Sequence, residues 1–278
     1  MHKILYSTQE VYSLLGREEV VLVDIRDSEA YRFGHIPGAV NLPEVFEYLC
    51  TADTGGLDTL HFTFQELFSR AGISFDRKVI FYEESLDSRY GSSCRGYWLL
   101  TYLGHDRAGI LDGGYLAWLE ENRPEELEPF NSMRAEFDIK TRPELIATKE
   151  DVLEAMGNPD VILLDNRDQE EWFGRSSSPY GIDYAPRKGR IPGAVWIEWY
   201  ELMDRSHEIP GFKSVRKIRD ICAARGIYPD SDIIIYCFKG SRAAHSYVAM
   251  ILAGFTKVRI YFASWNEWAR DFSLPIEK

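Results

Sequence analysis

The stretch VVLVDIRDSEAYRFGHIPGAVNLP, residues 20–43, decides the fold because most of it occurs a second time. Its counterparts are VILLDNRDQEEWFG at residues 161–174 and GRIPGAVWIEW at residues 189–199. An apolar run, a D-x-R triplet and an I-P-G-A turn return in the same order. A repeat of this kind indicates a duplicated structural unit, and we therefore interpret the chain as a tandem duplication.

The two copies differ by one insertion. The offset between matching residues is 141 from Asp24 to Asp165 and 155 from Pro37 to Pro192, so the second copy carries 14 additional residues. They lie around the sequence RSSSPYGIDYAPRK at 175–188. We expect a longer loop in the second half only.

Two further landmarks extend the repeat and indicate the fold class. VIFYE at 79–83 matches IIIYC at 233–237, and residues 102–118 match residues 252–268. The apolar runs are short, β-branched and nearly continuous, as in strands buried on both faces of a parallel sheet. Amphipathic stretches that end in Gly separate them and indicate helices. The sequence predicts an α/β fold of two tandem domains, each a central parallel sheet flanked by helices.

The length of the chain also suits two domains, since 278 residues are many for a single core. The predicted N-terminal domain spans residues 1–123 and the predicted C-terminal domain spans residues 145–278. Between them, residues 124–144 are charged, proline-bearing and aperiodic, which favours a linker.

The composition restricts the classes of function. A formal net charge of -12 argues against general binding to nucleic acid or to anionic membranes. No stretch approaches the ~20 apolar residues of a membrane span, and the first residues are too polar for a secretory signal. We expect a cytoplasmic protein. The four cysteines, at positions 50, 94, 222 and 237, lack zinc spacing and are expected to be reduced, so no metal or cofactor is predicted.

Cys237 stands where an apolar run, DIIIY, gives way to the turn CFKGSR. Ligands of open parallel sheets bind outside the carboxyl ends of strands. The turn and the start of the following helix favour an anion, as do the nearby cations Lys239 and Arg242. Gly240 permits the backbone angles that such a turn needs. A thiol in these surroundings is expected to be partly ionised at neutral pH, which predicts a nucleophilic or persulfide-bearing cysteine.

The first copy serves as an internal comparison. At the position of Cys237 it has Glu83, followed by a loop that is longer by four residues and contains Glu84 and Asp87. Carboxylates therefore replace the cationic surroundings of the thiol. We predict that the N-terminal domain is non-catalytic.

Several of these motifs together resemble one family. The D-x-R after a strand, the G-[HR]-I-P-G-A turn, the loop C-F-K-G-S-R and the final S-W-N-E-W resemble the rhodanese family of sulfurtransferases over about residues 6–273. The chain is similar to the tandem form whose N-terminal copy has lost its cysteine. This resemblance implies that the Cys237 thiolate takes sulfur from a donor such as thiosulfate and forms a persulfide. Cyanide, a small thiol or a protein thiol would then accept the sulfur.

The composition of the cysteine loop favours one donor. Within the family, thiosulfate-using members resemble Cys-x-Lys-Gly, whereas 3-mercaptopyruvate-using members resemble Cys-Gly-Ser-Gly. Lys239 therefore favours thiosulfate, because a cation beside the sulfur stabilises the bound oxyanion and the leaving sulfite. The predicted residues of the anion-binding loop are Phe238, Lys239, Gly240, Ser241 and Arg242.

The chain departs from the family in two places, of which one is Phe262 and Ala263, where an aspartate and a glycine usually precede the final S-W. Some members have a substrate-binding arginine six positions after the aspartate of D-x-R, and this chain has Glu171 there. Arg175, Arg187 and Arg190 in or beside the insertion are candidate substitutes. Which of them, if any, takes this role stays open.

Two other residues are weaker site candidates. Arg167 lies at a strand end in the second copy, but the D-x-R triplet occurs in both copies, which favours a structural ion pair between its Asp and its Arg. Trp265 is a candidate for the pocket wall, although buried aromatic residues belong to the core more often.

Other functions compete with this interpretation. Cysteine phosphatases and arsenate reductases of the same fold use Cys-x5-Arg, whereas this loop is Cys-x4-Arg and fits a tetrahedral phosphate poorly. A 3-mercaptopyruvate sulfurtransferase and a non-catalytic sulfur carrier or binding module also remain alternatives. The sequence leaves open the physiological donor and acceptor, the role of Cys94 and the oligomeric state.

Overall fold

The computed structural model describes residues 3–278 and consists of two compact units. The first unit includes the chain up to Tyr48, together with Asp58–Arg142 and Arg205–Gly211. The second unit contains Leu49–Leu57, Pro143–Asp204 and Phe212–Lys278. Among the described residues, no helix combines the length and the apolar character that crossing a membrane requires.

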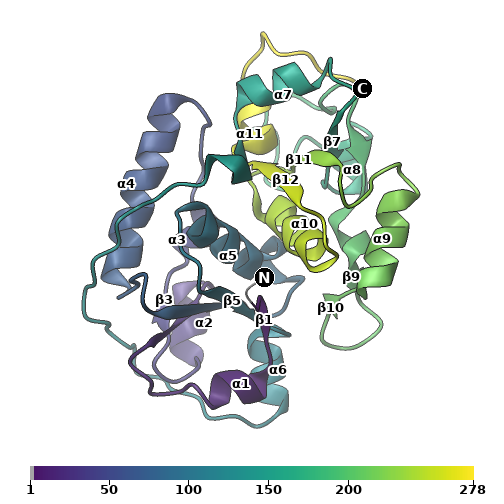
Figure 1. The fold of residues 1–278 in the computed structure, drawn as a ribbon. Helices are drawn as coiled ribbons and strands as arrows, with labels where there is room; N and C mark the ends of the chain where they lie inside the picture. Colours follow the sequence, from purple (N-terminus) through teal and green to yellow (C-terminus); the bar gives the residue numbers. More distant parts are fainter. Residues whose placement is uncertain (1–2) are drawn as a thin grey trace. The chain divides into compact units, whose positions relative to one another are not determined.

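The first unit is built on a parallel five-stranded sheet with the order β1-β5-β4-β2-β3. Its strands are β1 (Leu5–Tyr6), β2 (Val20–Asp24), β3 (Val40–Asn41), β4 (Lys78–Tyr82) and β5 (Ala108–Leu111). Figure 1 labels β1, β3 and β5 of this sheet. Side chains alternate between the faces of a strand. In β4, Ile80 and Tyr82 therefore face one core cluster, which includes Trp118, while Phe81 contacts Phe68 on the other face.

The second unit repeats this sheet with the order β6-β12-β11-β7-β8, again with parallel pairing throughout. Its strands are β6 (Ile146–Ala147), β7 (Val161–Asp165), β8 (Val195–Trp196), β11 (Asp232–Tyr236) and β12 (Lys257–Tyr261). The equivalence of the two sheet orders confirms the predicted fold of two tandem domains, each with a parallel sheet. A separate two-stranded sheet joins β9 (Met203–Asp204) to β10 (Gly211–Phe212).

Helices connect the strands, as parallel pairing requires. In the first half they are α1 (Thr8–Tyr12), α2 (Ser28–Phe33), α3 (Glu44–Glu47), α4 (Thr54–Arg70), α5 (Ser92–Tyr102) and α6 (Gly114–Glu120). In the second half they are α7 (Lys149–Ala155), α8 (Gln169–Trp172), α9 (Val215–Ala223), α10 (Ser241–Leu252) and α11 (Ser264–Trp268). Short 3-10 helices are η1 (Ser88–Tyr90), η2 (Pro143–Leu145) and η3 (Trp199–Leu202).

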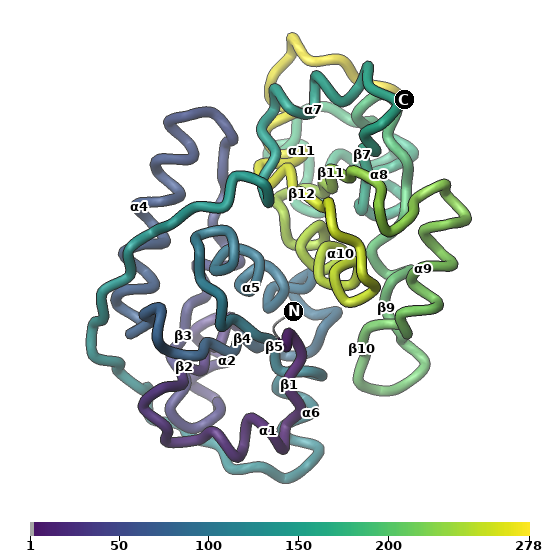
Figure 2. Tube along the Cα trace, in the orientation of Figure 1, coloured from purple at the N-terminus to yellow at the C-terminus, as the bar shows by residue number. Residues whose placement is uncertain are grey.

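Residues 124–144, the predicted linker, lack α-helix and contain no strand pairing beyond an isolated bridge from Glu126 to His35. The N–H of Ala135 donates to the carbonyl of Ser69, the penultimate residue of α4. Figure 2 accordingly shows this teal segment running alongside α4 before the chain reaches α7. The domain boundaries derived from the sequence stay a prediction.

Each unit also includes a short segment from the opposite half of the sequence. Leu49–Leu57 belongs to the second unit, and Arg205–Gly211 belongs to the first. The N–H of Ala52 donates to the Glu267 carboxylate at 2.7 Å, and Ala52 lies in the same core cluster as Trp265. Residues from the first half therefore help to form the core around α11.

The D-x-R triplet ends the second strand of each sheet and forms a buried ion pair. In the first unit, the Arg26 guanidinium donates to both oxygens of Asp24 and to the carbonyl of Gly34. In the second unit, Arg167 bonds Asp165 and the carbonyl of Gly189 in the same manner. The pair predicted from the sequence is present in both copies, and it ties the strand end to the turn that precedes I-P-G-A.

We predict that Asp165→Asn lowers the free energy of unfolding by about 3 kcal/mol or more, because Arg167 then stays buried without a counter-charge. Both side chains are inaccessible to solvent, so water does not screen this loss. Urea unfolding followed by circular dichroism measures the effect. Asp220→Asn is the matched control, since Asp220 pairs with Arg216 at 4.0 Å on the surface. An equal midpoint for both variants would contradict the prediction.

Candidate active site

Cys237 follows β11, whose neighbours in the sheet are β12 and β7, and it precedes α10. Cys237 is 1% exposed. Gly240 directly precedes the helix with a φ of 91°, in the left-handed region. A Cβ atom there would approach the Phe262 ring to 2.6 Å. Glycine is required at this position both for the backbone angle and for the space.

The Cys237 sulfur accepts a hydrogen bond from the backbone. The N–H of Gly240 lies 3.1 Å from Sγ. The first N–H groups of an α-helix have no partner within the helix, and they make its N-terminus electropositive. Because α10 begins at Ser241, the sulfur lies where backbone dipoles favour negative charge.

The loop is anchored to the start of α11 through three backbone contacts. The N–H of Cys237 donates to the Ser264 hydroxyl at 3.2 Å. The N–H of Trp265 donates to the Cys237 carbonyl, and the N–H of Asn266 donates to the Phe238 carbonyl. Ser264 has a φ of 59°, which is unusual for a residue with a side chain. This role of Ser264 was not predicted from the sequence.

Lys239 lies beside an aromatic ring from the insertion. Its Nζ is 5.0 Å from the centre of the Tyr180 ring, and the Phe238 ring is also 5.0 Å from that ring. An ammonium group over an aromatic face is attracted by the ring quadrupole. The longer loop of the second copy therefore contributes Tyr180 to the surroundings of the cysteine loop. This contact was not predicted from the sequence, in which the only hint of it is that the insertion contains aromatic residues.

Arg242 is paired with two carboxylates. Its guanidinium donates to both Glu171 oxygens, at 2.5 and 3.1 Å, and lies 3.0 Å from Asp168 Oδ1. Burial opposes the charged form of Arg242, but Glu171 and Asp168 outweigh it and raise its pKa well above the usual value. The position at which some relatives have an arginine is therefore occupied by the principal partner of Arg242.

Three of the other predicted site residues are connected through the Trp265 side chain in the second unit. Arg167 lies 4.3 Å from the centre of the Trp265 ring, and the Trp265 Nε1–H donates to the Arg187 carbonyl. Arg187 itself donates to the carbonyls of four residues, Trp268, Ala269, Asp271 and Leu274. These contacts fix α11 and the chain after it. Their assignment to substrate binding stays a prediction.

The remaining two arginines pair with carboxylates. Arg175 is exposed and pairs with Glu170 at 2.9 Å. Arg190 pairs with Glu277, and its guanidinium lies 4.4 Å from the centre of the Trp172 ring.

The first unit has the same backbone arrangement around a carboxyl group. Glu83 follows β4 and accepts four hydrogen bonds, from the N–H and hydroxyl groups of Ser92 and Ser93 at the start of α5. The N–H of Tyr115 donates to the Glu83 carbonyl, as that of Trp265 does to Cys237. The structure thus places Glu83 and Cys237 at equivalent positions.

The other titratable groups buried in the core are poor candidates for chemistry. Burial raises the pKa of Cys94 well above its usual value and raises that of Cys222 to about 12. Burial also lowers the pKa of His245 to about 3, so this imidazole is neutral between Trp199 and Phe212. Cys50, Cys94, Cys222 and Cys237 are all unbridged.

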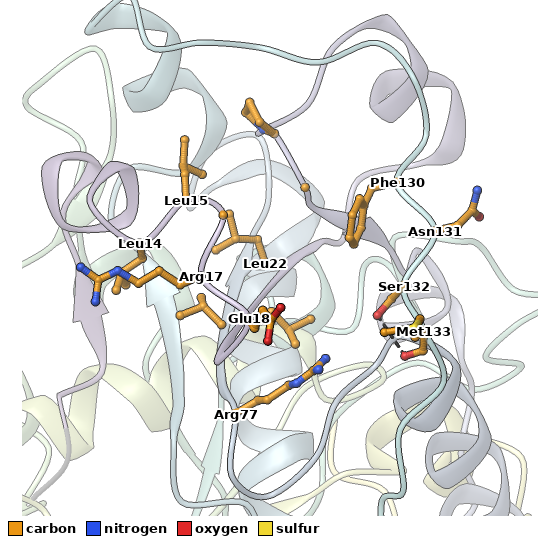
Figure 3. A pocket seen from close by; sticks show the side chains of 15 residues that line it. Leu14, Leu15, Arg17, Glu18, Leu22, Arg77, Phe130, Asn131, Ser132 and Met133 are labelled. Atoms are coloured by element: carbon orange, nitrogen blue, oxygen red, sulfur yellow. Dashed lines mark hydrogen bonds between the residues drawn. The ribbon is translucent and has the colours of Figure 1, made fainter.

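A separate cavity of about 380 Å³ lies in the first unit (Figure 3). It is lined by residues at the amino end of β2, including Leu22, and by Leu14 and Phe130. A groove of the second unit is lined by the corresponding residues, among them Met156 and Leu163. Both depressions lie at the strand ends opposite to Glu83 and Cys237, so they are common to the two copies and separate from the cysteine loop.

Comparisons with known proteins agree with the repeat. A rhodanese-like domain matches residues 7–121 and again residues 148–271. The sulfur carrier protein TtuD of Thermus thermophilus is 30% identical, over 99% of this chain and 97% of its own length. The thiosulfate sulfurtransferase of Azotobacter vinelandii is 29% identical, over 96% of this chain and 94% of its own length.

A solved structure shares the fold. A variant of EanB, in complex with ergothioneine covalently linked to a persulfide cysteine, superposes with a TM-score of 0.85 at 24% identity. The superposition covers 99% of this chain and 70% of the EanB chain.

The buried carboxyl group of Glu83 is expected to make the stability of the protein depend on pH. Burial, which outweighs its four hydrogen bonds, raises the pKa of Glu83 from 4.5 to about 8. Between these values the folded chain binds more protons than the unfolded chain, so stability falls as the pH rises through this window. We predict that Glu83→Gln removes this decline and raises the melting temperature at pH 8 to 9.

Differential scanning calorimetry between pH 5 and pH 9 measures this effect. Glu136→Gln, which removes a carboxyl group at an exposed position, is the control and should follow the wild-type profile. A Glu83→Gln profile that declines as steeply as the wild type would refute the assignment.

Proposed function

The chain belongs to the rhodanese family of sulfurtransferases as a tandem pair, and on that premise we propose that Cys237 carries the transferred sulfur as a persulfide, with thiosulfate as the donor. One observation carries this proposal. The Cys237 sulfur accepts the Gly240 N–H at the N-terminus of α10, in a loop that also presents Lys239. This arrangement stabilises negative charge on sulfur and on a sulfur-bound oxyanion.

The first half-reaction transfers the outer sulfur of thiosulfate. The Cys237 thiolate attacks this atom, a new S–S bond forms, and the S–S bond of thiosulfate breaks. The electron pair of the broken bond leaves with sulfite, so the charge is the same on both sides. Lys239 neutralises part of the charge on the donor and on the departing sulfite.

The second half-reaction regenerates the thiolate. A thiophilic acceptor attacks the terminal sulfur of the persulfide and takes it, and the electron pair of the persulfide bond returns to Cys237. Cyanide gives thiocyanate in this step, whereas a thiol gives a new persulfide. The Gly240 N–H and the start of α10 stabilise the Cys237 thiolate, which attacks in the first step and is released in the second.

The first unit does not take part in this chemistry. Glu83 is not a sulfur nucleophile, and its carboxyl group is bound by Ser92 and Ser93 at the start of α5. Its role in the proposed function is structural.

A second candidate function is sulfur carriage to a protein acceptor. It is favoured by the similarity to a protein named as a sulfur carrier, at 30% identity over nearly the whole chain. The same Cys237 persulfide serves both functions, which differ only in the acceptor. The 3-mercaptopyruvate and phosphatase alternatives fit less well, because Lys239 occupies the loop and Arg242 is bound to Glu171 and Asp168.

We predict that incubation with thiosulfate increases the intact mass of the protein by about 32 Da, one sulfur atom, and that cyanide removes the increase. Cys237→Ala should show no increase, whereas Cys222→Ala, the control for a buried thiol, should behave as the wild type. Mass spectrometry of the intact protein measures all three. A persistent increase in Cys237→Ala would reject the proposed nucleophile.

We predict that Lys239→Met raises the KM for thiosulfate by about tenfold, because it removes a nearly buried cation from the loop. Steady-state formation of thiocyanate at several thiosulfate concentrations measures this. Lys257→Met removes the same charge from the exposed start of β12 and should leave the KM unchanged. Equal KM values in both variants would exclude Lys239 from donor binding.

A further inference from the structure

Arg242 lies in the cysteine loop, but its charge is already compensated there. The guanidinium is 2% exposed, and its principal partner, Glu171, is 3% exposed. Asp168 is the second partner and is 33% exposed. A buried carboxylate acts on its neighbours with little screening by water, whereas a partly exposed one is screened.

Arg242 and the Cys237 sulfur both lie at the start of α10. Burial lowers the pKa of Arg242, whereas Glu171, Asp168 and, to a smaller extent, a negatively charged Cys237 sulfur raise it. Arg242 is also in the first turn of α10, two residues after the N–H that binds the sulfur. Any charge that cancels Arg242 therefore changes the potential at the sulfur and at a donor bound to it.

Carboxylates outnumber the cations near Arg242. The cations of the loop are Lys239 and Arg242, while the carboxylates near Arg242 are Asp168, Glu171 and Glu198. Glu171 also acts on the buried Arg167, but Asp165 already pairs with that cation. Thiosulfate is a dianion, and it therefore gains less from this loop than the two cations alone would provide.

We propose that Glu171 sets the charge selectivity of the site: by compensating Arg242 inside the loop, it weakens the binding of dianionic sulfur donors relative to monoanionic donors of the same shape. This inference rests on the proposed persulfide function. Glu171 does not contact the reacting sulfur and acts through Arg242, so it is a positioning residue that determines specificity.

A pair of donors isolates the effect of charge. Methanethiosulfonate has a methyl group in place of one thiosulfate oxygen and carries one negative charge instead of two. The Cys237 thiolate attacks its terminal sulfur, the S–S bond breaks with its electron pair, and methanesulfinate leaves, so atoms and charge balance. The reaction at Cys237 is otherwise the same for both donors.

The experiment compares kcat/KM for the two donors, with cyanide as the acceptor, in the wild type, Glu171→Gln and Glu170→Gln. Glutamine has nearly the same shape as glutamate and keeps one acceptor for Arg242. Glu170 is the matched control, because it is the preceding residue, is exposed and pairs with Arg175.

We expect the thiosulfate-to-methanethiosulfonate ratio of kcat/KM to rise about tenfold in Glu171→Gln, mainly through a lower KM for thiosulfate. Glu170→Gln should keep the wild-type ratio. A purely structural role of Glu171 would reduce the rates with both donors equally, and an unchanged ratio in Glu171→Gln overturns the proposal.

Asp168→Asn is the second variant, and it decides the question if Glu171→Gln does not fold. Because Asp168 also compensates Arg242 but is more exposed, we expect a smaller increase of the ratio, and no increase overturns the proposal.

The proposed function fails separately: a wild-type protein that takes sulfur from neither donor refutes the persulfide chemistry itself. If the wild type takes sulfur from both donors and the variants keep its ratio, only the role of Glu171 is refuted.

Discussion

The turn from β11 into α10 depends on the positive φ of Gly240. This angle allows the chain to start a helix directly after the strand while its N–H points back to the Cys237 sulfur. The Phe262 ring fills the space that a side chain at Gly240 would need. The position of the thiol is therefore determined by backbone geometry, and the hydrogen bonds to α11 fix the other side of the same loop.

The first unit shows that this framework does not by itself specify chemistry. Its β4 and α5 are arranged like β11 and α10, and Gly91 before α5 is also left-handed, with a φ of 73°. The group bound at the helix start is there the Glu83 carboxyl, supplied by the chain itself. The two copies thus use one electropositive helix end for different purposes: the first binds an internal carboxyl group, and the second presents a sulfur.

The fold and the location of the cysteine loop were predictable because they depend on repeats and on periodicity within short stretches. The D-x-R ion pair was predictable as well, since its partners are two residues apart and recur in both copies. The pairing of Arg242 with Glu171 was not, because these residues are 71 positions apart and their contact requires the folded sheet. Tyr180 was missed because the insertion has no counterpart in the first copy with which to compare it.

The inclusion of Leu49–Leu57 in the second unit, and of Arg205–Gly211 in the first, has a consequence for separating the two halves of the chain. The two segments occupy nearly equivalent positions in the repeats, so the exchange is reciprocal. A chain cut within residues 124–144 would therefore leave each half without a segment that belongs to its unit. Each half of the sequence is thus incomplete as a separate folding unit.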